Sequence, residues 1–209
     1  MPEYRVFLPE ILSDVPGCPD VTVEDKAELT VRDFCDQTEV WQEWRDIYID
    51  PDVDNYTLTP PPGSEINIVT KVVSNNIEIR AAPSPGPGLD DNNYDAPAGS
   101  VYSGWSFNPP NYLRLSGVPQ SESVLFVKMA LRPKAGHGSF PDWIWNRYKR
   151  FLISGVLARL LMQRGMTWSE PNLALVHQRE YQRGIARSRI DKVKGFSNKS
   201  LRVKFKRFI

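Results

Sequence analysis

Three stretches of the chain carry apolar residues at the spacing of a helix. In the first, Val23, Ala27 and Val31 follow one another at intervals of four residues, which places them on one side of a helix expected at about 23–38. Thr22 is the predicted N-cap, because its hydroxyl oxygen can accept a hydrogen bond from the open first turn. The proline-broken stretch before it predicts an arm with one helical turn.

The last third of the chain is predicted to hold the other two helices. Apolar residues recur at helical spacing over Trp143–Arg164, with Ser139 as the predicted N-cap and Gly165 just past the end. The next helix is expected to start after a second N-cap, Ser169, with Val176 on its apolar side. Because the connection between them is short, the two helices predict an αα-hairpin.

The middle of the chain alternates between apolar and polar residues, as strands do. The clearest strand pattern, at 65–73, is followed by turn residues that include Asn75 and Asn76, and then by a second alternating run. This pattern predicts a β-hairpin at 66–80. Residues 83–100, rich in Pro and Gly, predict a long loop. Further short strands are expected at about 44–49, 56–58, 101–107, 112–115 and 123–131.

These elements predict an α+β protein. We expect a small helical bundle, made of one N-terminal helix and a C-terminal αα-hairpin, interrupted by an antiparallel β insertion and ending in an extended C-terminal tail. The segments are an N-terminal arm and helix at 1–39, the β-rich insertion at 40–133, the helical hairpin at 134–194 and a basic tail at 195–209.

Composition narrows the class of protein. Hydrophobic residues make up 41% of the 209 positions and charged residues 24%, which is typical of a folded domain. The 18 prolines indicate long stretches of loop or extended chain. No apolar run approaches the roughly 18 residues of a membrane-spanning helix, so no membrane partner is expected. The first residues lack the pattern of a signal peptide, so we expect synthesis in the cytosol.

The formal net charge of +1 hides a strong polarity along the chain. Residues 128–209 hold 19 basic and four acidic residues, a net charge of +15, whereas 1–127 hold seven basic and 21 acidic ones, a net charge of −14. Three interpretations stay open. The basic half could face nucleic acid, it could face the acidic half of a neighbouring copy, or the halves could neutralise each other within one monomer.

Candidate catalytic and metal-binding residues are few. His137 lies in a Gly-rich loop and His177 on a helix without an acidic residue four positions later, so neither is expected to bind metal. The aspartates at 50–54 lack the Gly and Glu of a calcium-binding loop. Cys35 is expected to be a small core residue. We therefore predict no catalytic residues, no metal, no cofactor and no enzymatic activity.

Arginines form the first informative pattern. Arg179, Arg183 and Arg187 are spaced by four residues, so they form one stripe along the last helix. A solvated helix face usually mixes charges, and only Glu180 is acidic between positions 172 and 190. The stripe is therefore expected to face a polyanion or an acidic neighbour.

The end of the chain is the second informative pattern. Leu201, Val203 and Phe205 alternate with three cationic residues, which is a strand pattern with one apolar and one cationic face. Such a strand can add to the edge of another protein's sheet. A disordered nucleic-acid-binding tail is the alternative, but the strict alternation favours docking to a protein partner.

These features together resemble one family, the head-to-tail adaptor or connector proteins of tailed bacteriophages, which include proteins similar to tail tubular protein A. Three stretches over about a quarter of the chain carry the resemblance. They are Leu29–Thr38 with Val40 and Trp41, the helix with Phe140–Ile144 and Ile153–Leu160, and Trp168–Ala174 with Tyr181–Ala186.

The resemblance implies a structural protein of the virion neck, made in the host cytoplasm. Its implied partners are the portal protein, tail or nozzle proteins, further copies in a ring of twelve, and the double-stranded DNA that passes through the channel. The Arg179, Arg183 and Arg187 stripe would line that channel or pair with the next subunit. The portal-binding tail would comprise Leu201, Arg202, Val203, Lys204, Phe205, Phe208 and Ile209. The competing hypothesis is a basic nucleic-acid-binding protein outside any ring.

Overall fold

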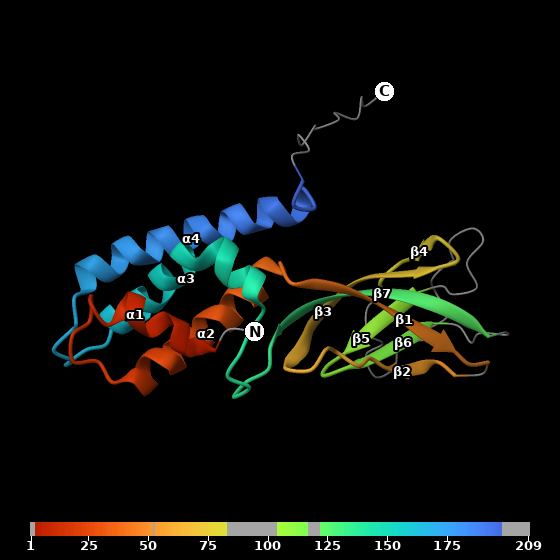
Figure 1. Ribbon diagram of the computed structural model, residues 1–209. Coiled ribbons are helices and arrows are strands. Elements are labelled where there is room, and N and C mark those ends of the chain that lie inside the picture. The colour runs from red at the N-terminus through yellow and green to blue at the C-terminus, as the bar shows by residue number, and fades with distance from the viewer. Residues whose placement is uncertain (1–2, 52, 83–103, 117–121, 198–209) are drawn as a thin grey trace, which may run out of the picture. The chain divides into compact units, whose positions relative to one another are not determined.

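The computed structural model describes residues 3–51, 53–82, 104–116 and 122–197 (Figure 1). Over these residues the protein is α+β, with four α-helices and seven strands in two antiparallel sheets. The helical elements are the 3-10 turn η1 (Tyr4–Phe7) and the helices α1 (Leu8–Ile11), α2 (Asp20–Thr38), α3 (Asp142–Leu161) and α4 (Pro171–Val193). The strands are β1 (Gln42–Ile49), β2 (Asn55–Thr57), β3 (Ser64–Ser74), β4 (Ile77–Ile79), β5 (Gly104–Asn108), β6 (Tyr112–Ser116) and β7 (Ser123–Pro133).

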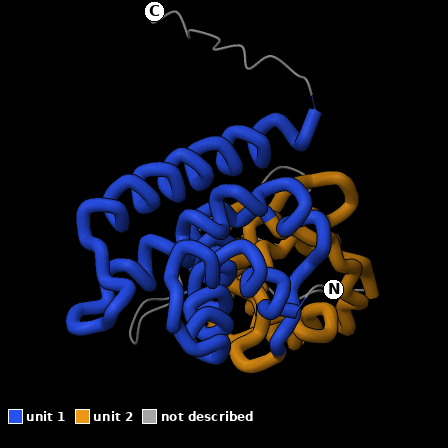
Figure 2. The backbone as a smooth tube through the Cα atoms, turned by 60° about the vertical axis from the view of Figure 1, so that its left-hand side comes forward, with its two compact units in different colours: residues 1–40, 138–209 blue, residues 41–137 orange. Residues whose placement is uncertain are grey.

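The chain divides into two compact units. Unit 1 comprises residues 1–40 and 138–209, and unit 2 comprises residues 41–137 (Figure 2). The prediction of a small helical bundle with one β insertion is therefore wrong. The β segment is a compact unit of its own with two sheets, and the N-terminal arm adds η1 and α1 to the helical part. The predicted extended tail lies largely at 198–209, outside the described residues.

Unit 1 is built around the inner face of α2. Val23, Ala27, Val31 and Phe34 are fully buried there, as their spacing predicts. The N-terminal arm also contributes to this core, because its side chains Tyr4, Phe7, Ile11 and Val15 are buried. The stretch before α2 is therefore a packed part of the unit and not a loose arm.

Proline begins each of the three longer helices, where the sequence predicts hydroxyl caps. Pro19 occupies the N-cap of α2 and Pro141 that of α3, while Pro171 is the first residue of α4. Thr22, Ser139 and Ser169 are therefore not the N-caps. Proline suits the first turn because the backbone N–H that it lacks would have no partner inside the helix.

Helices α3 and α4 form the predicted αα-hairpin, packed closely through two glycines. A Cβ atom added at Gly184 would lie 2.4 Å from Phe151 Cβ. One added at Gly155 would lie 2.6 Å from Thr30 Cγ2 and 2.7 Å from Tyr181 Cδ2. Only glycine permits such close approach of α4 to α3 and of α3 to α2.

Unit 2 contains a four-stranded sheet in the order β1-β7-β3-β4 and a three-stranded sheet in the order β2-β6-β5. The predicted hairpin is confirmed as β3 and β4, and its turn residues Asn75 and Asn76 have φ values of 48° and 64°. The chain after β4 passes to the second sheet, where Trp105 N donates to Arg80 O and Ala82 N donates to Trp105 O. Alternate residues of β7, Leu125, Val127, Met129 and Leu131, are fully buried.

Candidate functional site

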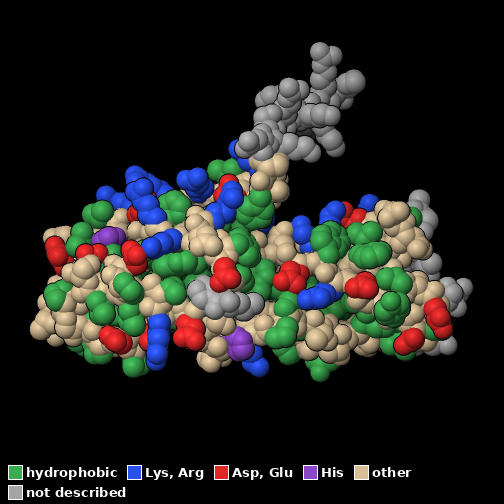
Figure 3. Space-filling view, viewed as in Figure 1, with side chains coloured by type: hydrophobic (Ala, Val, Ile, Leu, Met, Phe, Trp, Pro, Cys, Tyr) green, Lys and Arg blue, Asp and Glu red, His purple; other side chains and the backbone are tan. Residues whose placement is uncertain are grey.

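Helix α4 has two opposite faces. Tyr181, Ile185 and Ser188 are buried against the rest of unit 1. At 3.6 residues per turn, Arg179 and Arg183 lie on the side opposite Tyr181, and both are exposed, as is Arg187. The structure therefore places the three arginines of the predicted stripe on one outward face, where Figure 3 shows lysine and arginine side chains gathered along α4.

The outward face of α4 is also rich in apolar side chains. Val176 and Val193 are 57% and 65% exposed, and Leu175 and Ile190 are about half exposed. The expectation that Val176 belongs to the apolar core side of this helix is wrong, because position 176 falls on the arginine side of the turn. An exposed face that mixes aliphatic and arginine side chains is typical of an interaction surface.

Most of the stripe's positive charge is left uncompensated by the residues that the structure describes. Glu180 accepts ion pairs from Arg150 of α3 at 3.0 Å and from Arg183 at 3.2 Å. Within the part of the chain that the structure describes, Arg179 and Arg187 have neither a hydrogen bond nor an ion pair. Neither the place of Arg150 beside the stripe nor the double pairing of Glu180 could be predicted from the sequence, since both depend on how α3 crosses α4.

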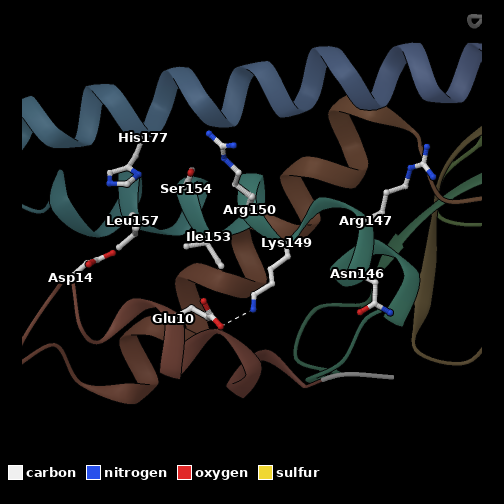
Figure 4. A pocket seen from close by; sticks show the side chains of 10 residues that line it. All are labelled: Glu10, Asp14, Asn146, Arg147, Lys149, Arg150, Ile153, Ser154, Leu157 and His177. Atoms are coloured by element: carbon white, nitrogen blue, oxygen red, sulfur yellow. Dashed lines mark hydrogen bonds and ion pairs between the residues drawn. The ribbon is translucent and has the colours of Figure 1, made fainter.

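A hollow of about 420 Å³ lies where the stripe meets α3. Its lining is Arg150, Ser154, Val176, His177, Arg179, Glu180 and Arg183. Figure 4 shows the adjoining hollow, of about 550 Å³, in which Lys149 reaches Glu10 at 2.6 Å and Arg150 rises toward α4. His177 projects from α4 toward Leu157 of α3 in the same view. Both hollows are lined by charged groups of mixed sign.

The C-terminal end of α4 is held against the start of α3. Asp191 Oδ2 accepts hydrogen bonds from Arg147 Nε at 3.2 Å, from Arg147 Nη2 at 3.1 Å and from the Tyr148 hydroxyl at 3.1 Å. The ring of Phe196 packs edge-on to Trp143 at 5.9 Å, and the Arg147 guanidinium lies 5.0 Å from the same ring. These contacts hold the turn that follows α4 against the start of α3. The seven predicted tail residues from Leu201 to Ile209 lie outside the described residues.

A partly buried polar cluster joins α2, α3 and α4. Asp33 Oδ2 accepts a hydrogen bond from Arg159 at 3.0 Å and from the Tyr181 hydroxyl at 2.8 Å. The Tyr181 hydroxyl also lies 3.2 Å from the carbonyl oxygen of Thr30. Burial, followed by the charge of Asp33, raises the pKa of Tyr181 well above its usual range. The phenol therefore stays protonated and keeps donating to Asp33.

Other residues singled out in the sequence lie apart from the stripe. Cys18 and Cys35 are both buried, and burial raises the pKa of each thiol. His137 belongs to unit 2. Among the described residues no group of three or more His, Cys, Asp or Glu side chains is placed to hold a metal ion. Over those same residues, no helix has the length and apolar character needed to cross a lipid bilayer.

Unit 2 presents an aromatic surface that the sequence analysis missed. Trp44 and Tyr48 of β1 and Phe126 of β7 are exposed, and Tyr48 is 75% exposed. Asp46 pairs with Phe126 across the strands, so these side chains share the outer face of the four-stranded sheet. Lys128 lies 5.8 Å from the Trp44 ring. The alternation of Trp44, Asp46 and Tyr48 was a usable signal for this face.

The described residues of unit 1 thus bring together an interaction surface. What the outward face of α4 offers chemically is aliphatic contact area and guanidinium groups that can pair with carboxylates or phosphates. Comparison of the chain with known protein-family models and with curated proteins finds no match.

Proposed function

We propose that the chain is a structural protein of a tailed-bacteriophage virion, a head-to-tail adaptor without enzymatic activity. Copies of it form a ring, of twelve in the family that the sequence resembles, between the capsid portal and the tail. The ring binds the portal vertex, extends the DNA channel and carries tail or nozzle proteins. The protein is made in the host cytoplasm and is then assembled into the virion neck.

The outward face of α4 is the observation that carries this proposal. Four aliphatic side chains and three arginines lie together on one side of the helix, uncovered by the described part of the chain. An exposed apolar surface of this kind marks a site where another molecule binds. The motifs that carry the family resemblance also include the residues of the closest helix packing in unit 1, Gly155, Tyr181 and Gly184.

The portal contact belongs to the C-terminal segment in this proposal. Leu201, Val203 and Phe205 enter apolar sites on the portal, each contributing about 1.5–3 kcal/mol before the cost of ordering the chain. One segment would bind weakly, but many segments tethered to one ring bind tightly through effective concentration. The packing of Phe196 against Trp143 gives every copy the same starting point for this segment.

The decisive experiment measures particle mass by size-exclusion chromatography with light scattering, with and without the portal protein of the same phage. We expect a ring-sized complex with the portal, and its loss when residues 198–209 are deleted. The truncated chain should keep its melting temperature, because the deleted residues lie beyond the packed end of α4. A truncated protein that still caps portals would move the contact to the α3–α4 hairpin.

A nucleic-acid-binding protein outside any ring is the second candidate. The positions of Arg179 and Arg187 favour it, since both are exposed and, among the described residues, unpaired. This function predicts that a monomer or dimer binds duplex DNA with an affinity that falls steeply as salt rises. Changing both arginines to Glu should abolish that binding. If the protein is an adaptor, the same change should instead impair the retention or ejection of DNA by the virion.

A further inference from the structure

We propose that the outward face of α4 in one copy binds the outward face of α2 in the next copy. This inference deepens the proposed function and rests on it for the closure of a ring. It names both halves of the contact between subunits. The occupant of the α4 face is thus a second copy of this chain.

Helix α2 presents a surface of matching kind. Val21, Asp25 and Leu29 follow at four-residue intervals on the side opposite the buried Ala27 and Phe34. Val21 is 68% exposed and Leu29 49% exposed, although both are aliphatic. Asp25 is exposed between them, and over the described residues it has no hydrogen bond or ion pair. The outward face of α2 therefore offers apolar contact beside an uncompensated carboxylate.

The segments that carry the two faces have opposite net charges. Residues 1–40, which include α2, hold ten acidic and three basic residues, a net charge of −7. Residues 171–197, which include α4, hold six basic and two acidic residues, a net charge of +4. Aliphatic side chains interrupt the charges on both helices, so apolar contacts can form beside the ion pairs. This is the complementarity expected of two surfaces that bind each other.

The two faces cannot meet within one copy. The inner faces of α2 and α4 already contact each other, since Tyr181 of α4 lies 3.2 Å from Thr30 O and 2.8 Å from Asp33 Oδ2 of α2. The face that carries Asp25 and the face that carries Arg179 both point away from this shared core. Their complementarity can therefore be satisfied only between copies. Because the paired faces differ, the contact is head-to-tail and builds a ring or a chain of copies.

Charge reversal tests this contact in both halves. The first variant reverses the α4 face (Arg179→Glu, Arg183→Glu and Arg187→Glu), and the second reverses the α2 face (Asp25→Arg). Each variant alone should associate at least about tenfold more weakly than the wild type, alone or on portal, as measured by light scattering over a concentration series. Combining all four changes in one chain should restore association to within about threefold of the wild type.

Mixing makes the test more specific. In an equimolar mixture of the two variants, every reversed α4 can meet a reversed α2 and every wild-type α4 a wild-type α2. A head-to-tail contact therefore predicts that the mixture assembles although neither variant does so alone. The matched control, Arg80→Glu with Lys134→Glu and Arg164→Glu, makes the same change of net charge at exposed positions off α4 and should assemble normally.

The outcomes separate this contact from the proposed function. The α2–α4 contact is overturned if association survives in each of the two charge-reversed variants. It is also overturned if the combined variant and the mixture stay dissociated while every variant keeps its circular dichroism spectrum. In those cases the ring and the portal can still be intact. Copies that associate through these faces but never bind a portal support the contact and overturn the adaptor function. A wild type that never associates, with or without portal, overturns both.

Discussion

Two glycines and one tyrosine hydroxyl determine how the helices of unit 1 meet. Gly155 and Gly184 lie where a neighbouring side chain occupies the space of a Cβ atom. Tyr148 is almost fully buried but turns its hydroxyl toward Asp191 near the end of α4. These residues are set within the helices, so the effects of changing them can be separated from any effect on the outward faces.

Gly184→Ala should destabilise the protein by about 1–3 kcal/mol, because the new methyl group would collide with Phe151. The sign is informative, since Gly→Ala inside a helix ordinarily stabilises by about 0.5–1 kcal/mol. Urea denaturation measures the difference. Gln182→Ala, at an exposed neighbouring position, should change the free energy of unfolding by less than about 0.5 kcal/mol. A more stable Gly184→Ala protein would contradict the packing described here.

Tyr148 predicts a loss of stability at alkaline pH. Burial, followed by the charge of Asp191 and its hydrogen bond, raises the pKa of the phenol from 10.0 to about 12. The folded-state pKa lies above the unfolded one, so the contribution to stability is complete below pH 10 and disappears as the pH rises toward 12. Its size is on the order of 2 kcal/mol.

The measurement compares urea denaturation of the wild type and Tyr148→Phe from pH 8 upward. The wild type should be the more stable protein at pH 8, and its advantage should shrink between pH 10 and pH 12. In Asp191→Asn the loss should begin at the same pH, near 10, but be smaller and end at a lower pH, because the negative charge that raises the folded-state pKa is gone. A wild-type advantage that stays constant over this interval would be evidence against the contact between Tyr148 and Asp191.

At the scale of elements, the two faces of α4 have different roles. Its inner face packs through Tyr181, Gly184 and Ile185, and its outer face is available to another molecule. Its last turn is held by Asp191 and Phe196, which contact α3 at Arg147, Tyr148 and Trp143. The contacts of Asp191 and Phe196 therefore hold the chain to α3 just before the C-terminal segment, and substitution of either residue tests them directly.

Phe196→Ala should loosen the end of α4 without unfolding unit 1. The change removes the ring that packs on Trp143 and leaves the helix core untouched. We expect faster hydrogen exchange of the backbone amides at 190–196, by roughly tenfold, and unchanged exchange at 148–160. Val193→Ala serves as the control, since this side chain is exposed and its loss should leave exchange unchanged. Equal protection in Phe196→Ala and wild type would mean that Asp191 alone holds this turn.

At the scale of the whole molecule, acidic and basic residues are concentrated in different segments of the chain. Unit 1 itself contains both the acidic residues 1–40 and the basic residues 171–197. Some of them pair internally, as Lys192 does with Glu39 at 2.9 Å. In the contact that we propose, the outward charges of α2 and α4 pair between copies.

Association of copies should therefore weaken with salt. Raising the ionic strength from about 50 mM to about 500 mM shortens the range of charge interactions to a few ångström, so the apparent dissociation constant should rise by at least about tenfold. Sedimentation at several salt concentrations measures the shift. The combined charge-reversed variant should show the same salt dependence, whereas Leu175→Ser should weaken association at every salt concentration. Association that strengthens with salt would indicate a mainly apolar contact.

Local patterns were sufficient to predict several elements. The intervals of four in α2 and of two in β3 follow from the period of each backbone, so Val31 and the β3–β4 hairpin could be placed from the sequence. The spacing of Arg179, Arg183 and Arg187 likewise puts them on one side of any helix. Charge by segment could also be counted directly.

Tertiary structure alone decided how these elements are combined. The division of seven strands between two sheets depends on contacts between residues far apart in sequence, such as Trp105 with Arg80, which no local period contains. The same holds for the buried N-terminal arm and for the pairing of Arg150 with Glu180. The period of the apolar residues assigns each residue to one face of its helix, but only the packed neighbours decide which face is buried. Val176 is exposed on α4 for this reason, whereas Tyr181 is buried beside Thr30.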